Sequence, residues 1–145
     1  MGFKTIEGGI EKYSVLRTLR AIERSNVCML VVDASEAITA QDTHIAGEIL
    51  ESYKGVVIVV NKWDLVEKRI TRKEMLQEIS HRLKFIPYAP VCFASALLGT
   101  GVQTVVEKAI AVYQEGSKMV SHQTLNRTLM SALSSHPPTG RKGRP

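Results

Sequence analysis

Three apolar runs rich in β-branched residues recur along this sequence, at 27–34 (VCMLVVDA), 56–62 (VVIVVNK) and 91–96 (VCFASA). Their nearly continuous hydrophobicity is typical of strands that are covered on both faces, as in a parallel sheet. A strand with one face in water would instead alternate apolar and polar residues. The runs therefore predict three parallel strands buried between layers of helices.

Segments with helical periodicity flank these runs, at 9–25, 39–53, 71–85 and 101–114. In the segment at 39–53, Thr39 is the expected N-cap and the apolar repeat includes Tyr53. In the segment at 71–85, Thr71 and Glu74 have the spacing of a capping box and the apolar repeat includes Leu76. Helices that alternate with parallel strands require right-handed crossovers. We therefore expect an α/β fold with helices on both faces of the sheet.

Composition narrows the class of protein further. Apolar residues make up 44% of the 145 residues, which suffices for one domain core, and the net charge of +5 slightly favours polyanionic partners. No apolar run is long enough to span a membrane, and residues 1–9 lack the apolar centre of a secretory signal. Cys28 and Cys92 lie inside apolar runs, so we expect reduced core thiols in a cytoplasmic protein. The scattered histidines do not indicate a metal site.

Polar residues follow the second and third runs at the point where each predicted strand ends. They are Asn61, Lys62 and Asp64 after the second run, and Ser95, Ala96 and Leu97 after the third. Ligands of open α/β sheets bind beyond the carboxyl ends of the strands, so both loops are expected to face one ligand. We expect the neighbouring Trp63 to pack in the core, and Asp33 to cap the loop before Thr39.

Guanine fits the chemistry of these residues. Its ring N–H and exocyclic amino group are adjacent donors that the carboxylate of Asp64 can accept together, which adenine cannot match. Asn61 can donate to the base edge and join the loops, while the stem of Lys62 can lie over the ring with its ammonium in water. The backbone N–H of Ala96 is expected to donate to the keto oxygen.

The segments 11–27 (EKYSVLRTLRAIERSNV), 59–68 (VVNKWDLVEK) and 83–97 (LKFIPYAPVCFASAL) resemble the second GTPase domain of the bacterial ribosome-assembly GTPases called Der or EngA. The resemblance implies a P-loop GTPase-like fold, binding of GTP or GDP, and a partner in rRNA or the large ribosomal subunit. In that family a KH-like domain follows, and residues 125–138 (LNRTLMSALSSHPP) resemble its first helix. We therefore expect a GTPase-like part at 1–116 and a short helical segment with a basic tail at 117–145.

The sequence contains no phosphate-binding loop of the form G-x-x-x-x-G-K-[ST] and no D-x-x-G motif. By the resemblance, both would precede the helix that starts near residue 10. We therefore expect a partial GTPase domain, with base contacts to GTP or GDP but no catalytic residue and no ligand for the Mg²⁺ of the complete family domain. The strand at 27–34 would have an open edge that favours self-association, unless residues 1–9 fold back as a substitute strand.

Two other interpretations remain open. The chain is alternatively a non-enzymatic module that binds rRNA or a ribosomal protein through its basic parts, or an unrelated doubly wound domain that binds no nucleotide. Arg17, Arg20 and Arg24 share one helix face, which a solvated surface explains better than an RNA contact. The tail at 139–145 is expected to be disordered, after a helix that ends near His136.

Overall fold

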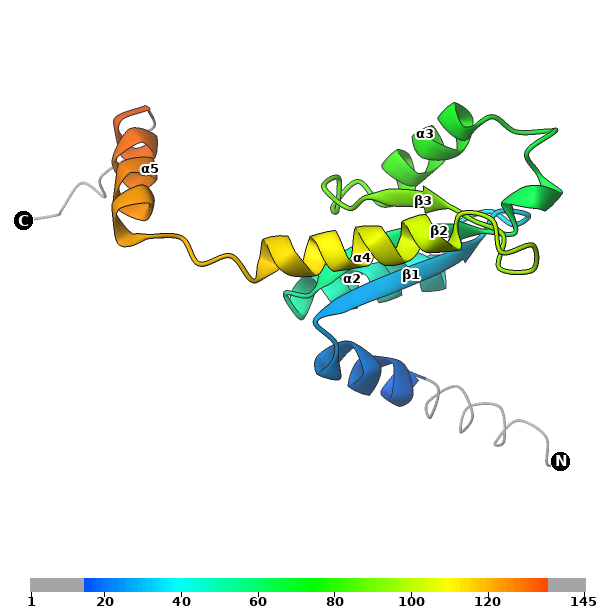
Figure 1. Cartoon of the computed structure of the whole chain (residues 1–145), viewed down its shortest axis with the longest axis horizontal. Helices are drawn as coiled ribbons and strands as arrows, with labels where there is room; N and C mark the ends of the chain where they lie inside the picture. The colour runs from blue at the N-terminus through cyan, green and yellow to red at the C-terminus, as the bar shows by residue number, and fades with distance from the viewer. Residues whose placement is uncertain (1–14, 136–145) are drawn as a thin grey trace, which may run out of the picture.

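A computed structural model of the chain describes residues 15–135 (Figure 1). Residues 15–24 are helical, and the elements that follow are β1 (Val27–Asp33), α2 (Ala40–Glu51), β2 (Gly55–Asn61), the 3-10 turn η1 (Trp63–Leu65), α3 (Arg72–Arg82), β3 (Val91–Phe93), α4 (Val102–Gly116) and α5 (His122–Ser135). The predicted order of helices and strands is confirmed. The predictions for residues 1–9, His136 and the tail at 139–145 lie outside the described residues.

The three strands form one parallel sheet in the order β1-β2-β3. β1 pairs with β2 along its whole length, from Val27 opposite Gly55 to Asp33 opposite Asn61. β3 is only three residues long, because the chain leaves the strand after Phe93 and turns back at Ser95, whose N–H donates to the carbonyl of Thr100 at 2.9 Å. The predicted α/β class with parallel strands is confirmed, with a third strand shorter than the run at 91–96.

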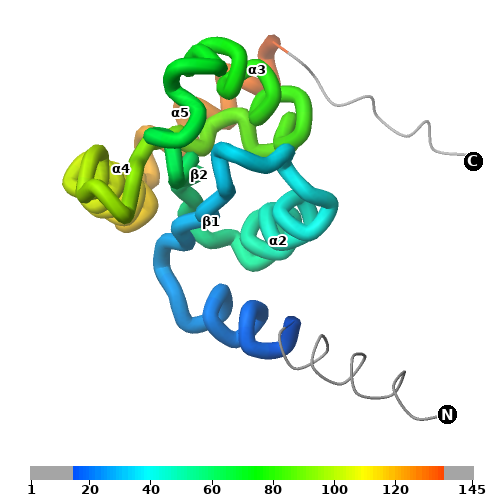
Figure 2. Tube along the Cα trace, turned by 90° about the vertical axis from the view of Figure 1, so that its right-hand side faces the viewer, coloured from blue at the N-terminus to red at the C-terminus, as the bar shows by residue number. Residues whose placement is uncertain are grey.

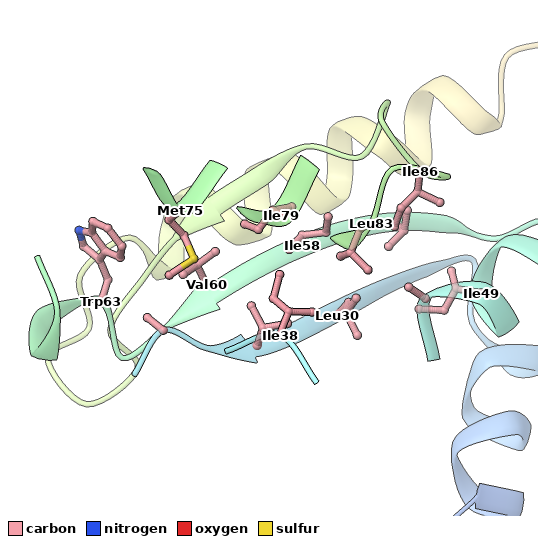
Figure 3. Close-up of a cluster of buried hydrophobic side chains, with 14 of the residues drawn as sticks. Leu30, Ile38, Ile49, Ile58, Val60, Trp63, Met75, Ile79, Leu83 and Ile86 are labelled. Carbon is pink, nitrogen blue, oxygen red and sulfur yellow. The ribbon is translucent and has the colours of Figure 1, made fainter. Parts of the chain in front are cut away.

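Helices cover both faces of the sheet, as Figure 2 shows from the side. On one face, α2, α3 and the helix at 15–24 pack against side chains of β1 and β2, and Figure 3 shows this cluster around Ile58 and Val60. On the other face α4 packs on Val57 and Val59. The alternate residues of β2 therefore serve two cores, which explains why this run has no polar residue before Asn61.

The N-termini of α2 and α3 have the caps that the sequence predicts. Thr39 accepts from the N–H of Asp42, whose carboxylate accepts in return from the N–H of Thr39. Thr71 and Glu74 make the same reciprocal pair at the start of α3. Each box satisfies two backbone donors that the first helical turn would leave unpaired.

Tyr53 and Leu76, both in predicted apolar repeats, lie outside the core. Tyr53 is 97% exposed, because α2 ends at Glu51 and the backbone of Tyr53 takes a positive φ of 54° before entering β2. Leu76 is 42% exposed, and its neighbour Met75 is buried in its place. A periodicity of three or four residues fixes a helical face only to within about one position, since i+3 and i+4 are both allowed.

β1 forms an edge of the sheet (Figure 2). Ala34 donates to Asn61 and the carbonyl of Asn26 accepts from Gly55, so the even-numbered residues of β1 direct their backbone groups to β2. Backbone groups alternate in direction along a strand, so those of the odd-numbered residues face the open edge. Among these, Met29 and Val31 also have side chains that are 53% and 55% exposed.

α5 stands apart from the sheet (Figure 1), and none of its residues is buried. Its leucines at 125, 129 and 133 repeat every four residues and lie about half exposed. The segment therefore has an amphipathic sequence without an apolar partner among the described residues. Among residues 15–135, no helical segment combines the length and the hydrophobicity that a membrane span requires.

Candidate functional site

The carboxyl ends of the three strands are joined by backbone hydrogen bonds. Ala34 donates to the carbonyl of Asn61 at 2.8 Å, and Trp63 donates to the carbonyl of Ala94 at 3.1 Å. Ala94 in turn donates to the carbonyl of Val60 at 2.9 Å. These bonds hold the loops after β1, β2 and β3 side by side at the edge where ligands of open α/β sheets bind.

Asn61 connects the loops after β2 and β3 through its side chain. Its Oδ1 accepts from the backbone N–H of Ala96 at 3.0 Å, between residues 35 positions apart in the sequence. The amide oxygen is thereby engaged, which leaves the Nδ2 group of Asn61 as a donor for a ligand. The N–H of Ala96, expected to donate to a base, is already bonded inside the protein.

Lys62 has a left-handed backbone, with φ 58° and ψ 31°, and its ammonium forms an ion pair with the carboxylate of Asp33. Asp33 also accepts through Oδ1 from the N–H and the hydroxyl of Ser35, at 2.9 and 2.6 Å. The expected role of Asp33 in capping the following loop is therefore confirmed. The bond to Lys62, followed by those to Ser35, lowers the pKa of the Asp33 carboxyl from 3.8 to about 2.

Trp63 and Asp64 belong to the turn η1 but differ in environment. Trp63 is 7% exposed and belongs to the buried cluster drawn in Figure 3. Its ring packs edge-on against that of Phe93, with 4.6 Å between the ring centroids, so its predicted packing role is confirmed. Asp64 is half-buried, and its carboxylate makes no hydrogen bond or ion pair within the described residues. A carboxylate without a partner at the end of a parallel strand is available to accept hydrogen bonds from a ligand.

Ser95 organises the loop after β3 from inside the protein. It is 1% exposed, and its hydroxyl accepts from the N–H of Leu98 at 3.2 Å. Leu97, between them, is 88% exposed, and its backbone N–H has no acceptor in the described part of the chain. The turn therefore presents a free backbone donor at Leu97, beside the engaged N–H of Ala96.

Gly101 closes this loop and is the N-cap of α4. Its φ is 75°, and an added Cβ would lie 2.3 Å from the carbonyl oxygen of Phe93. The loop can therefore pass this close to β3 only with glycine at that position. Gly99 has a similar φ of 70° but open space around it.

The residues expected at the site therefore fall into two groups. The structure brings Asn61, Lys62, Asp64, Ala96 and Leu97 to the same edge of the sheet, while Ser95 acts from the buried side. Sequence reasoning missed the pairing of Asp33 with Lys62. The signal for it is positional, because Asp33 ends a predicted strand next to the one that Asn61 ends.

The two cysteines are free thiols. Cys92 is buried against α4, which confirms its core role, and burial raises the pKa of its thiol. Cys28 is only half-buried and lies 3.1 Å from the hydroxyl of Ser25. Within residues 15–135 no group of three or more histidines, cysteines or acidic residues is arranged to hold a metal ion.

Comparisons with known proteins agree with this architecture. Residues 9–135 match the model of the elongation factor Tu GTP binding domain. The chain is 48% identical over 134 residues to the GTPase Der of Chloroflexus aggregans and 46% identical over 136 residues to that of Herpetosiphon aurantiacus. These matches cover 92% and 93% of this chain but only 30% of each relative, so the chain spans about a third of their length.

A solved structure of a probable GTP-binding protein, engB, has the same fold. Its TM-score is 0.61 at 19% identity, and the match covers 79% of this chain and 71% of that one. The parallel sheet, the joined loops at its carboxyl edge and the match along residues 9–135 lead to one conclusion. The chain belongs to the family of elongation factor Tu GTP-binding domains, and its Der relatives indicate a GTP-binding domain of the Der type.

Proposed function

We propose that this chain recognises the guanine base of GTP and GDP, as part of a Der-type GTPase that acts in assembly of the large ribosomal subunit. The observation that carries the proposal is the unpaired carboxylate of Asp64 at the carboxyl edge of the sheet. It can accept from both adjacent donors of guanine at once. The N–H of Leu97 and the Nδ2 of Asn61 are donors for the keto oxygen and the ring nitrogen on the other side of the base.

The division of the chain follows the same proposal. Residues 1–116 correspond to the back part of the GTPase domain, and residues 117–145 to the start of a KH-like domain. The isolation of α5 supports this division, because its leucine repeat lacks a partner within the described residues. A helix with an exposed apolar face gains most of its stability from packing against another element.

Hydrolysis requires more than the base contacts. Phosphoryl transfer depends on a phosphate cradle, Mg²⁺ and a positioned water, and the sequence contains no phosphate-binding loop. The sequence also contains no D-x-x-G motif. We therefore assign no hydrolytic step to this chain and expect no GTP turnover above background from it alone.

The test is base preference. GDP, ADP and xanthosine diphosphate are titrated into the chain, with the fluorescence of Trp63, its one tryptophan, as the readout. We expect GDP to bind most tightly, and Asp64→Asn to weaken GDP binding by roughly tenfold or more while shifting preference toward the xanthine base. The shift follows because an amide can donate to the second keto group of xanthine, where a carboxylate can only accept.

Glu67→Gln is the matched control, because Glu67 is an exposed carboxylate one turn beyond Asp64. It should leave all three affinities unchanged. Equal affinities for the three diphosphates, or an Asp64→Asn variant that behaves like Glu67→Gln, would show that Asp64 does not read the base.

A second candidate function is binding of rRNA, and it is favoured by a basic surface around α3. This surface consists of the exposed residues Lys68, Arg69, Arg72, Lys73, Arg82 and Lys84, none of which has an acidic partner in an ion pair of the described residues. Arg72, Lys73 and Arg82 lie on α3, and the other three lie in the loops on either side of it. Exposed cations of this kind suit a phosphate backbone, and such binding weakens steeply as salt rises. Salt-sensitive RNA binding that Arg69→Glu with Lys73→Glu abolishes, without protection of the fold by GDP, would favour this function over base recognition.

A further inference from the structure

Lys62 stands two residues before Asp64, so its ammonium is a natural competitor for the Asp64 carboxylate. An ammonium on a flexible four-carbon stem forms an ion pair with any accessible carboxylate within reach. If Lys62 paired with Asp64, it would occupy acceptor positions that a base needs. In the structure the ammonium pairs with Asp33 instead, and Asp64 has no partner within the described residues.

Strand register explains why Asp33 is within reach. Asp33 ends β1 directly opposite Asn61, the last residue of β2, and Lys62 follows with its left-handed backbone. The side chain of Lys62 is 53% exposed and that of Asp33 is 23% exposed, so their ion pair lies at the surface of the site. Asp33 is itself held by Ser35, whose N–H and hydroxyl both donate to Oδ1 while Oδ2 faces the ammonium.

Other charges near Lys62 reinforce the same geometry. The bond to Asp33 raises the pKa of Lys62, and the more distant carboxylate of Glu36 adds to the effect. Asp33 ends β1 and Glu36 lies in the loop that follows it, so both acidic groups belong to the carboxyl end of β1. The charge distribution therefore draws the ammonium toward the end of β1.

We propose that Asp33 is a positioning residue for base recognition: by holding the ammonium of Lys62 at the end of β1, it keeps the carboxylate of Asp64 open for the base. The inference rests on the proposed function of Asp64 and adds a residue from a strand outside the two base-facing loops. It also assigns Lys62 a fixed location, with its stem crossing from the loop after β2 to the end of β1.

Asp33→Asn is the variant that tests this role, because an amide oxygen can still accept from Ser35 while the negative charge is lost. In the full 145-residue chain we expect Asp33→Asn to weaken GDP binding by about fivefold, read by Trp63 fluorescence. The background Lys62→Met keeps an apolar stem without an ammonium. In that background the same Asp33→Asn change should have no effect on GDP binding. In the native background Asp33→Glu, which keeps the negative charge, should bind GDP as tightly as the native chain.

An equal loss in both backgrounds, or no loss in the native one, would overturn the proposal. NMR of the ligand-free chain provides an independent measurement, by detecting which carboxyl carbon lies next to the Lys62 ammonium. It should be that of Asp33 in the native chain and that of Asp64 in Asp33→Asn; any other partner in the variant overturns the proposal. If the native chain does not distinguish GDP from ADP, the proposed base recognition fails. The NMR result then still decides whether Asp33 holds the ammonium of Lys62 away from Asp64.

Discussion

At the scale of single residues, the loop after β3 depends on Gly101 for both its shape and its closeness to the sheet. Gly101→Ala should destabilise the chain by roughly 3 kcal/mol or more, because its Cβ would meet the backbone of Phe93 at 2.3 Å as well as strain a positive φ. Gly99→Ala is the control, since it shares the positive φ of 70° without any close atom. It should cost only about 1–2 kcal/mol. Urea unfolding of both variants measures the difference, and equal costs would disprove the close approach.

The Asp33 carboxyl predicts a dependence of stability on acid. Its pKa is about 2 in the folded chain, against an ordinary value of 3.8, so the unfolded chain binds its proton first as the pH falls. The contribution of the ionised Asp33 carboxylate to the stability of the folded chain is therefore complete above about pH 4, and it is lost as the pH falls from about 4 to about 2. Asp33→Asn should flatten the acid branch of the stability curve in that window and leave the curve near pH 7 parallel to the native one. A native-like acid slope in the variant would contradict this.

Residue-level contacts were predictable only in part. The polar residues at the end of β2 could be predicted to face a ligand, because Asn61, Lys62 and Asp64 stand at the end of a buried apolar strand whose packing does not require polar side chains. Their individual bonds were not, because the donor to Asn61 lies 35 positions along the chain and the carboxylate that holds Lys62 lies on another strand. Such pairings depend on sheet register and on loop geometry, which periodicity does not specify.

At the scale of elements, the capping boxes make a matched pair of predictions. Thr71→Ala should lower the stability of the chain by about 1 kcal/mol, because the N–H of Glu74 loses its acceptor at the start of α3. Glu74→Gln should cost less, since glutamine can still accept from the backbone of Thr71. Thermal or chemical unfolding of the two variants measures the order. A larger loss for Glu74→Gln would show that charge, and not the Thr71 cap, holds this helix end.

Element types were the most predictable part of the fold, since composition and caps agree at each of them. Which face of each helix is buried, and at which residue each element ends, were less predictable. α4 exposes a second apolar line, with Val106 and Ile110 at 44% and 51% exposure, beside the line that packs on the sheet. A sequence that is apolar on two adjacent faces shows that both are suited to packing, but the sheet present here covers only one of them.

At the scale of the whole molecule, the open edge of β1 is the feature with the largest predicted effect. The unpaired backbone groups of this edge are a template for pairing with another chain, and the total stability of a domain is only about 5–15 kcal/mol. We therefore expect the chain to be marginally stable and to associate through residues 27–34. Supplying the front part of a Der-type GTPase domain in trans should suppress this association by providing the neighbouring strand.

Val31→Lys tests the edge, because a lysine on an open strand disfavours pairing with another chain. It should reduce association measured by light scattering. Val106→Lys is the matched control, because Val106 is also an exposed valine, at 44% exposure, but lies on α4 and not on the sheet edge. It should leave association unchanged. A native chain that is a uniform monomer, with amides of residues 28–32 well protected from hydrogen exchange, would mean that the edge is covered by another part of the chain.

The two borders of the sheet differ in length, and that difference limits how large an assembly can grow. β1 offers seven residues to a new strand, whereas β3 at the opposite border offers three. Short edge strands are poor templates for addition. Growth by strand pairing therefore has one productive direction, and two chains joined border to border through β1 would have only their short β3 borders left. The expected product of self-association is a closed pair and not a filament.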